Sequence, residues 1–185
     1  MPNDVVTNAQ GLLGRTLHGH GVAVRITEVE AYGGVEDPAS HAYTRTQRSE
    51  IMYGAPWRLY VYRSYGMHFC ANIVTGPTEK AAAVLIRAGE VVGGIDLARE
   101  RRPGVKDVAL ARGPGNLART LALTLDDLGT DLLGRDGVRL GEPPIARPEV
   151  SVGPRVGVSK AADVPWRFWV TGDPTVSAYR RNPRA

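Results

Sequence analysis

The stretch VAVRITEVEAY, residues 22–32, constrains the fold most, because it alternates as a β-strand does yet places acids on its apolar face. Side chains two residues apart lie on the same face of a strand. The face that starts apolar carries, in order, Val22, Val24, Ile26, Glu28, Glu30 and Tyr32. Buried carboxylates are costly unless they are paired, hydrogen-bonded or functional. Either the strand leaves the core after Ile26, or the acids are buried for a function, which the nearby Tyr32 and His41 favour.

The rest of the chain predicts one mixed α+β domain over residues 1–185. Apolar residues at helical spacing, or a Gly/Pro start, predict helices within 4–14, 93–102 and 112–123. Alternation between turn residues predicts strands within 15–32, 58–75, 81–90, 151–160 and 167–173. The remaining segments are predicted to be an irregular loop at 33–54, turns and short strands at 129–150, and a loose tail at 178–185. A loop as long as 33–54 in a compact domain is usually functional or disordered.

Composition favours a globular chain with one core. The 185 residues are 43% hydrophobic and 23% charged, which is ordinary for a folded domain. Apolar runs such as AAAVLI at 81–86 are far shorter than a membrane span, and the N-terminal residues lack the pattern of a secretory signal. A single cysteine, Cys70, excludes an internal disulfide and suits a reducing compartment. We therefore expect a cytoplasmic protein with no membrane partner, and a monomer by default.

The basic residues favour a nucleic-acid partner. The formal net charge is +4, the sequence pI is about 9.5, and only three of the 23 basic residues are lysines. Between residues 97 and 120 the acids are only Glu100 and Asp107, whereas the bases are Arg99, Arg101, Arg102, Lys106, Arg112 and Arg119. The planar guanidinium group matches phosphate geometry, so this cluster predicts contact with an anionic polymer.

The stretch RLYVYRSYGMHF, residues 58–69, predicts a hairpin with a large ring at its tip. Tyr65 stands beside Gly66 at the turn, where small polar residues are usual. Tyr60 and Tyr62 alone could be ordinary aromatic residues of a sheet. An exposed aromatic on a rigid stalk, however, has the shape of a wedge that enters a base stack and fills the hole left by a flipped base.

A metal site is the other chemistry that these acids allow. The candidate ligands are Glu28, Glu30, Glu36, Asp37 and His41. They lack a recognised ligand spacing, so we expect no metal. Nothing in the sequence indicates an organic cofactor either.

Four motifs resemble one known family of enzymes. They are ITEVEAYGGVEDPASHAY, LYVYRSYGMHFCANIV, VLIRAGE and RVGVSKAADVPWRFWVTGDPTVS. In this order they are similar to the alkyladenine DNA glycosylases, also called 3-methyladenine or alkylpurine DNA glycosylases, and the chain resembles a bacterial member reduced to the catalytic domain. The resemblance implies a curved, mainly antiparallel sheet, flanking short helices and a protruding hairpin that inserts into DNA.

The resemblance also implies a role for individual residues. Glu30 corresponds to the general base that activates a water, and Arg87 and the main-chain carbonyl of Val156 correspond to groups that hold this water. Three pocket residues stack on and hydrogen-bond to the flipped base, namely Tyr32, His41 and Tyr62. Asn72 crowds the 2-amino group of a purine and so disfavours guanine. The residues expected to contact DNA are Tyr65 as the wedge, Met67, His68, Arg45, Thr46 and Arg48.

The implied activity is that of a monofunctional glycosylase of base excision repair. Its partner is double-stranded DNA containing damaged purines, and its product is an abasic site, because no lysine nucleophile is matched. Two positions depart from the family's pattern: His68 replaces another aromatic residue of some members, and Asn116 replaces a usual lysine. The alternative function is a non-catalytic module that keeps the wedge and senses distorted duplex.

Overall fold

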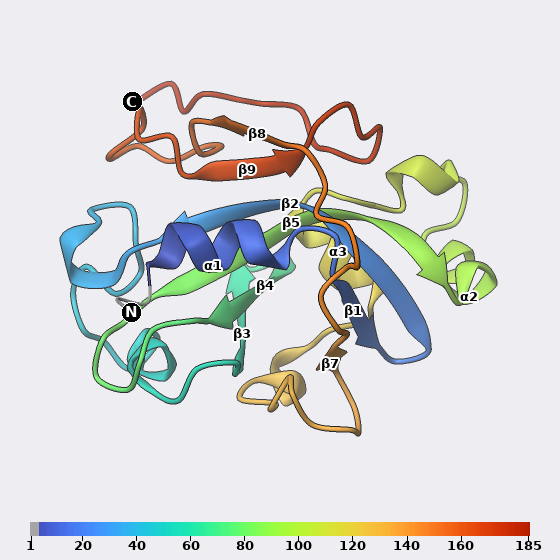
Figure 1. Ribbon diagram of the computed structural model, residues 1–185, viewed down its shortest axis with the longest axis horizontal. Coiled ribbons are helices and arrows are strands. Elements are labelled where there is room, and N and C mark those ends of the chain that lie inside the picture. Colours follow the sequence, from blue (N-terminus) through green and yellow to red (C-terminus); the bar gives the residue numbers. More distant parts are fainter. Residues whose placement is uncertain (1–3) are drawn as a thin grey trace.

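A computed structural model describes residues 4–185 as one α+β domain (Figure 1). The strands are β1 (Thr16–Gly19), β2 (Val22–Tyr32), β3 (Leu59–Ser64), β4 (His68–Val74), β5 (Ala83–Gly93), β6 (Ala111–Arg112), β7 (Arg139–Leu140), β8 (Val150–Gly153) and β9 (Arg167–Val170). The helices are α1 (Val5–Leu12), α2 (Ile95–Arg101) and α3 (Pro114–Thr120). Short 3₁₀ turns are η1 (Gly34–Glu36), η2 (Glu50–Tyr53), η3 (Asp107–Ala109) and η4 (Leu125–Asp127). The predicted mixed class and the three helices are confirmed.

All strand pairs in the described chain are antiparallel, in one curved sheet of order β3-β4-β5-β2-β1-β7. The two longest strands, β2 and β5, pair along most of their lengths and form its centre. The other edge of β2 is shared, because β1 pairs with its first residues and β9 pairs with residues 28–30. β8 then pairs with β9, and both lie above β2 in Figure 1.

The shared edge explains why both acids of β2 are buried. Every residue from Ile26 to Ala31 is buried, and Glu28 and Glu30 are 0% exposed. The interpretation in which the strand leaves the core after Ile26 is wrong, because β9 and the segment that follows it cover this part of β2. The register between β2 and β5 shifts on both sides of Glu28, so the acids lie at an irregular point of the sheet. Bulges of this kind bend a strand and redirect its side chains.

The helix α1 lies across β2 and β5 at the front of Figure 1. Asp4 starts this helix, since its carboxylate accepts a hydrogen bond from the Val6 main-chain N–H at 3.1 Å. The residues that α1 turns to the core are Val5, Ala9 and Leu12, at helical spacing. The helix α3 begins with Pro114 at its first position and packs against β4 and β5. No helix among residues 4–185 is long and apolar enough to cross a membrane.

The strand predicted at 151–160 is mostly wrong. β8 ends at Gly153, and residues 154–160 form a loop. Pro154 has no N–H to donate to a sheet, and Arg155 is instead held by the Ala31 carbonyl and the Asp37 carboxylate. The predicted tail, 178–185, contains no helix or strand, but it is attached to this loop, because the Gly157 N–H donates to the Arg180 carbonyl at 2.9 Å.

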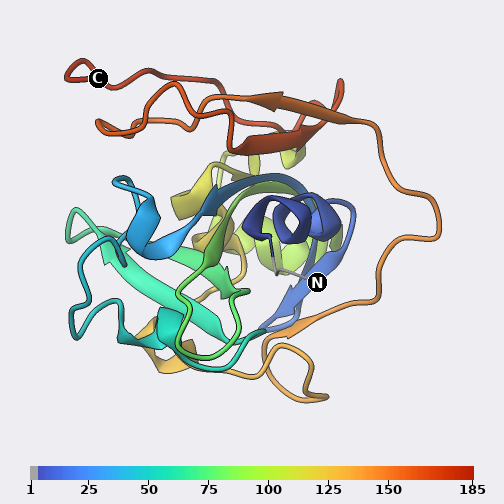
Figure 2. The same cartoon turned by 60° about the vertical axis from the view of Figure 1, so that its left-hand side comes forward.

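The β3–β4 hairpin ends in a tight turn that Tyr65 and Gly66 form. Their φ angles are 48° and 70°, and the Met67 N–H donates to the Ser64 carbonyl at 3.1 Å. Positive φ at both central residues defines a type I′ turn, which favours Asn-Gly. In Figure 2 the teal hairpin extends toward the left edge, away from α1. Tyr65 is 93% exposed and Met67 is 76% exposed.

Candidate active site

Glu28 is the centre of a buried, fully paired cluster. Its Oε1 accepts hydrogen bonds from the Arg87 Nε at 2.9 Å and the Arg167 Nε at 2.7 Å. Ser177 donates its hydroxyl to Oε1 at 2.9 Å and its main-chain N–H to Oε2 at 2.7 Å. Burial acts to raise the pKa of Glu28, but Arg87, Ser177 and Arg167 outweigh it and hold this pKa below its ordinary value. Glu28 is therefore ionised, and its acceptor sites are largely used.

Glu30 has fewer partners than Glu28. Its Oε1 accepts the Val156 main-chain N–H at 2.7 Å, and its Oε2 accepts the Tyr32 hydroxyl at 2.8 Å. The Arg87 Nη1 lies 3.4 Å from Oε1. Since an ionised carboxylate offers about four acceptor sites, Glu30 retains capacity for a further donor such as a water. The predicted role of Val156 concerns its carbonyl, and the contact to Glu30 is made by its N–H.

Arg87 joins the two acids because of its place in β5. Glu28 is paired with Ala88 and Val29 with Ile86, so Arg87 is the extra residue at the register shift, and its side chain contacts both carboxylates of β2. Burial acts to lower the pKa of Arg87, but Glu30 and Glu28 raise it above its ordinary value. The guanidinium group therefore stays charged within the site.

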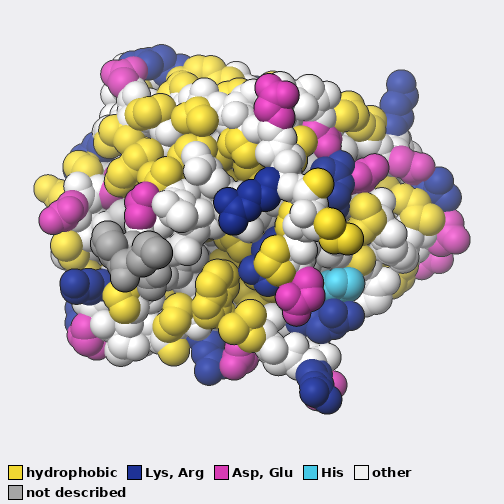
Figure 3. All heavy atoms as spheres, in the orientation of Figure 1, with side chains coloured by type: hydrophobic (Ala, Val, Ile, Leu, Met, Phe, Trp, Pro, Cys, Tyr) yellow, Lys and Arg dark blue, Asp and Glu magenta, His cyan; other side chains and the backbone are white. Residues whose placement is uncertain are grey.

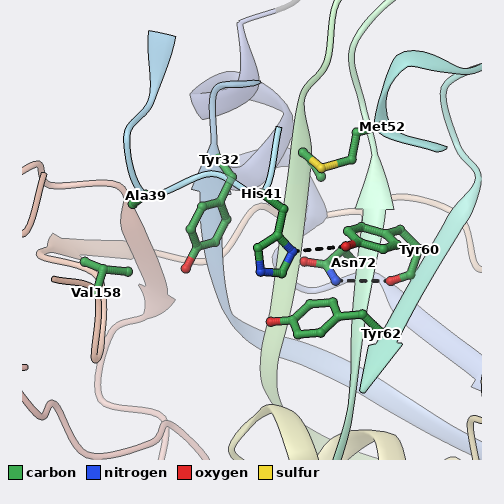
Figure 4. A pocket seen from close by; sticks show the side chains of 9 residues that line it. Tyr32, Ala39, His41, Met52, Tyr60, Tyr62, Asn72 and Val158 are labelled. Atoms are coloured by element: carbon green, nitrogen blue, oxygen red, sulfur yellow. Dashed lines mark hydrogen bonds between the residues drawn. The ribbon is translucent and has the colours of Figure 1, made fainter. Parts of the chain in front are cut away.

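An aromatic pocket of about 160 Å³ opens beside the acids. Its lining residues come from β2, the 33–54 loop, η2, β3, β4, β5 and the loop after β8, and are Tyr32, Ala39, His41, Met52, Tyr60, Tyr62, Asn72, Ala83 and Val158. Figure 4 shows Tyr32 on one side, Tyr60 and Tyr62 on the other, and His41 between them. Tyr32 belongs to the pocket wall and also donates to Glu30, so it connects the pocket to the acid cluster.

The ionisation states in the pocket suit a neutral, hydrogen-bonding cavity. Burial and the neighbouring Glu30 raise the pKa of Tyr32 well above its ordinary value, so its hydroxyl keeps its proton. Burial and the neighbouring Arg48 lower the pKa of His41 to about 4, so this ring is neutral near pH 7. His41 Nδ1 shares a hydrogen bond with the Tyr60 hydroxyl at 3.0 Å. The amide of Asn72, 5% exposed, donates to the Tyr60 carbonyl at 3.1 Å.

The residues of the 33–54 loop that are predicted to contact DNA differ in their surroundings. The guanidinium of Arg48 lies 4.7 Å from the centre of the Tyr62 ring, at the pocket. Arg45 is paired with Glu50 and with Glu79, at 2.5 Å and 3.0 Å. The Thr46 N–H donates to the Ser49 hydroxyl at 2.9 Å within a local turn. The structure therefore gives Arg45 and Thr46 partners within the protein, and their contacts to DNA stay predictions.

A groove of about 490 Å³ lies between the hairpin and α3. It is lined by residues from both elements, from the last residue of α2 and from the segment after α3, namely Met67, His68, Phe69, Arg101, Gly115, Arg119, Ala122, Leu123 and Thr124. His68 approaches Gly115 so closely that a Cβ there would lie 3.1 Å from the His68 Cβ. The groove places two arginines beside the exposed tip.

Some arginines of the predicted cluster already have partners within the protein. Arg99 pairs with Asp96 at 3.0 Å and Asp107 at 2.8 Å, and Arg101 donates to two main-chain carbonyl groups. Arg119 is exposed. On the face seen in Figure 3, basic and acidic side chains are interspersed and form no continuous basic surface.

The acids and the histidine considered as metal ligands do not come together as a set. Glu28 and Glu30 bind arginines, and Asp37 pairs with Arg155 at 2.6 Å. In the part of the chain that the structure describes, no group of three or more His, Cys, Asp or Glu side chains is arranged to hold a metal ion.

Comparison with known proteins decides which family has this arrangement. A family model described as methylpurine-DNA glycosylase (MPG) matches residues 1–174. The chain belongs to the methylpurine-DNA glycosylase family. As a member of this family it is a DNA glycosylase, and so a hydrolase.

Curated relatives of this glycosylase cover almost the whole chain. A protein of Nocardia farcinica is 53% identical over 191 residues, which span 98% of this chain and 90% of the relative. Proteins of Mycobacterium leprae and Mycobacterium tuberculosis are 51% identical over 192 residues, spanning 98% of this chain and 88% and 93% of those proteins. All three carry the name "Putative 3-methyladenine DNA glycosylase".

Several residues that build the candidate site are not predicted from the sequence. Arg167 and Ser177 complete the shell of Glu28, and Tyr60 bonds to His41. Arg155 pairs with Asp37 and lies 4.8 Å from the centre of the Tyr32 ring. All of these residues lie within the four motifs that carry the family resemblance. Their contacts are not predicted, because the partners are distant in sequence.

Proposed function

We propose that this DNA glycosylase removes alkylated or deaminated purines, 3-methyladenine among them, from double-stranded DNA and leaves an abasic site. The observation that carries the proposal is Glu30, a carboxylate with no solvent exposure whose Oε2 is bonded to a tyrosine of an aromatic pocket. The names of the relatives from Nocardia and Mycobacterium support the same substrate class.

Glu30 acts in this proposal as the general base. A water accepted by its remaining lone pairs attacks C1′ of the damaged nucleotide and gives its proton to the carboxylate. The N-glycosidic bond breaks, its electron pair leaves with the base, and the sugar gains a hydroxyl group at C1′. The sugar becomes positively charged as the bond stretches, so the buried negative charge of Glu30 also stabilises the transition state.

Arg87 and Val156 serve this step by holding the carboxylate and the water. The Val156 N–H and the Arg87 Nη1 both face Oε1 of Glu30. We expect the water to lie beside Arg87 and the Val156 carbonyl, on the side of the carboxylate that faces the pocket. The backbone would then fix the Val156 carbonyl, and burial would fix Arg87. Neither group would need to reorganise during the reaction.

The pocket fits a flipped purine that is cationic or electron-poor. Tyr32 and Tyr62 offer ring faces on its two sides, and electron-rich ring faces attract a cation such as 3-methyladenine. His41 is neutral near pH 7 and can donate or accept one hydrogen bond at the edge of the base. Asn72 lies at the pocket wall, where we expect it to crowd the 2-amino group of guanine.

Flipping a base leaves a hole in the duplex, and the hairpin tip can fill it. We assign this role to Tyr65, with Met67 and His68 beside it, because the tip is exposed and rigidly held by two paired strands. Arg48 lies over Tyr62 of the pocket, and Arg101 and Arg119 line the groove beside the hairpin, so these cations are candidates for phosphate contacts. Phosphate contacts by these groups would make binding strongly salt-dependent.

The reaction should stop at the abasic site. The described residues that line the pocket include no lysine, so no amine is placed to form a Schiff base with the sugar. We accordingly propose a monofunctional enzyme, acting as a monomer in the cytoplasm on DNA, with no metal or organic cofactor.

Base release tests this proposal directly. Duplex oligonucleotides with one 7-methylguanine, hypoxanthine or 1,N6-ethenoadenine, and methylated genomic DNA, are incubated with wild type, Glu30→Gln and Glu36→Gln. Glu36 is an exposed acid near the site, so its substitution controls for the loss of a carboxylate. We expect strand cleavage only after alkali, a loss of about a hundredfold or more in Glu30→Gln, and wild-type rates in Glu36→Gln.

Two other outcomes would contradict the proposal. Full activity of Glu30→Gln would remove Glu30 from the role of general base. If wild type bound damaged duplex but released no base from any substrate, the protein would be a non-catalytic sensor of distorted DNA.

A further inference from the structure

The two acids of β2 share Arg87 unequally. The Arg87 Nε lies 2.9 Å from Glu28 Oε1, whereas its Nη1 lies 3.4 Å from Glu30 Oε1. Charge-assisted N–H···O bonds are typically about 2.7–2.9 Å long. Only the contact to Glu28 has this length, so Arg87 is anchored on Glu28 and only approaches Glu30.

Glu28 is itself fixed by groups that have no contact with the base pocket. Arg167 of β9 and both donors of Ser177 hold its two oxygens at 2.7–2.9 Å. The Arg167 Nη2 also donates to the Ser177 carbonyl at 2.8 Å. The C-terminal strand and the segment after it therefore determine where Arg87 can lie.

We propose that Glu28 is a positioning residue that keeps Arg87 from closing onto Glu30, and so preserves Glu30 as a free base. This inference rests on the proposed role of Glu30 as general base. A tight Arg87–Glu30 pair would occupy the acceptor site that the water needs, and it would make the carboxylate a weaker proton acceptor. The anchored arginine instead stays close enough to orient the site.

The sign of the effect follows from the charged and titratable groups packed around Glu30 and its two neighbours, Arg87 and Tyr32. Tyr32 on β2 and Arg87 on β5 contact Glu30 directly, and Arg167 on β9 is its register partner. Glu28 pairs with Arg87, Cys70 on β4 faces Arg87, and Arg155 lies over the Tyr32 ring. Removing the negative charge of Glu28 takes away a like charge and lets Arg87 move toward Glu30. Both changes favour the ionised form of Glu30, so it would hold its proton less tightly.

The pH dependence of base release tests this inference. Single-turnover rates on a 7-methylguanine or hypoxanthine duplex are measured from acid to neutral pH for wild type and Glu28→Gln. In a plot of rate against pH, we expect the acidic limb, where the rate rises with pH, to move to lower pH by about one unit or more in Glu28→Gln. Its plateau rate should fall by roughly threefold to tenfold, as Brønsted behaviour predicts for a weaker base.

A matched control and an opposite change make the test specific. Glu90→Gln removes another arginine-paired carboxylate, since Glu90 bonds to Arg25 at 2.8 Å on the exposed side of β5, and its limb should coincide with wild type. Arg167→Gln removes a cation from Glu28, so Arg87 should be drawn further from Glu30 and the limb should move to higher pH. Arg167→Lys keeps the charge and should keep the limb in place.

A second readout does not depend on activity. The ¹³C resonance of the Glu30 carboxyl group, assigned by its loss in Glu30→Gln, reports its protonation directly in each variant. If folded Glu28→Gln and Arg167→Gln lose activity but show unchanged limbs and unchanged Glu30 titration, Glu28 is only structural and the inference is wrong. If wild type releases no base while the titrations shift as expected, the proposed function fails and the positioning role stands.

Discussion

The acid cluster and the hairpin tip differ in burial and in the number of contacts that hold their side chains. Around Glu28 and Glu30, side chains with 0–8% exposure are held by several partners each, from four separate strands and loops. At the tip, Tyr65 is 93% exposed and its backbone has a φ of 48°, which a bulky residue rarely adopts. The side chains of the acid cluster are therefore held in fixed positions, whereas the tip exposes an aromatic ring to water on a strained turn.

In the proposed mechanism this difference corresponds to two separate tasks of the enzyme. A carboxylate that must act on a water benefits from fixed neighbours, because preorganised dipoles need not rearrange during the reaction. A wedge must instead be free to leave water and enter a base stack, so it gains from exposure. Strain that persists at one residue of a well-ordered hairpin is typical of functional sites. Substitutions in the two regions should therefore separate stability from activity.

The largest effect on stability is expected from the buried arginine of the loop after β8. Arg155 and Asp37 are both nearly inaccessible and 2.6 Å apart, and Arg155 also donates to the Ala31 carbonyl. Arg155→Ala leaves a buried carboxylate unpaired, so the free energy of unfolding should fall by about 3–5 kcal/mol. Urea denaturation, followed by circular dichroism, measures this loss.

An exposed pair of similar length is the control for Arg155→Ala. Arg181 lies 2.7 Å from Asp163, but both side chains are largely exposed, so Arg181→Ala should leave unfolding close to wild type. If the free energy of unfolding fell equally in the two variants, burial would not distinguish these ion pairs. The contrast between interior and surface would then be wrong.

The sequence predicts the acid cluster only in part, and this pair shows why. Strand periodicity brings Glu28, Glu30 and Tyr32 to one face, and the family resemblance adds Arg87 and His41. It does not bring Arg155 to Asp37, because 118 residues separate them and the contact depends on how β8 and β9 return over β2. The segment 151–160 alternates enough to predict a strand, but tertiary contacts turn most of it into a loop.

The sequence does not determine whether the two acids are buried, for the same reason. Local alternation cannot tell whether a strand edge is covered, and β9, which covers it, lies almost 140 residues further along the chain. The hairpin is the opposite case. Its two strands are adjacent in sequence, so the register, the turn at Tyr65 and Gly66 and the exposure of the ring all follow from local residues.

Removing the ring of the proposed wedge, Tyr65, should affect activity and not stability. Tyr65→Ala deletes an exposed ring that makes no contribution to the core, so urea denaturation should change little. Single-turnover base release from a duplex should fall by about tenfold or more, because nothing fills the hole left by the flipped base. Release from a single-stranded substrate should fall much less, since no stack has to be opened.

Met67→Ala is the matched control, because Met67 is also exposed at the tip but does not occupy the central turn position. It should reduce duplex activity less than Tyr65→Ala does. If Tyr65→Ala lost the same factor on duplex and on single strands, the ring would act in the pocket or in general binding, and the wedge assignment would be wrong.

The smallest expected effect has the opposite sign and tests the strain itself. Asn tolerates positive φ better than Tyr and is favoured beside Gly in type I′ turns, so Tyr65→Asn should raise the free energy of unfolding by up to about 1 kcal/mol. The same variant lacks the ring and should lose duplex activity as Tyr65→Ala does. A gain in stability together with a loss of base release would show that the hairpin keeps a less stable turn for the sake of its ring. If Tyr65→Asn were no more stable than wild type, the turn would hold Tyr65 without strain, and exposure alone would distinguish the tip from the acid cluster.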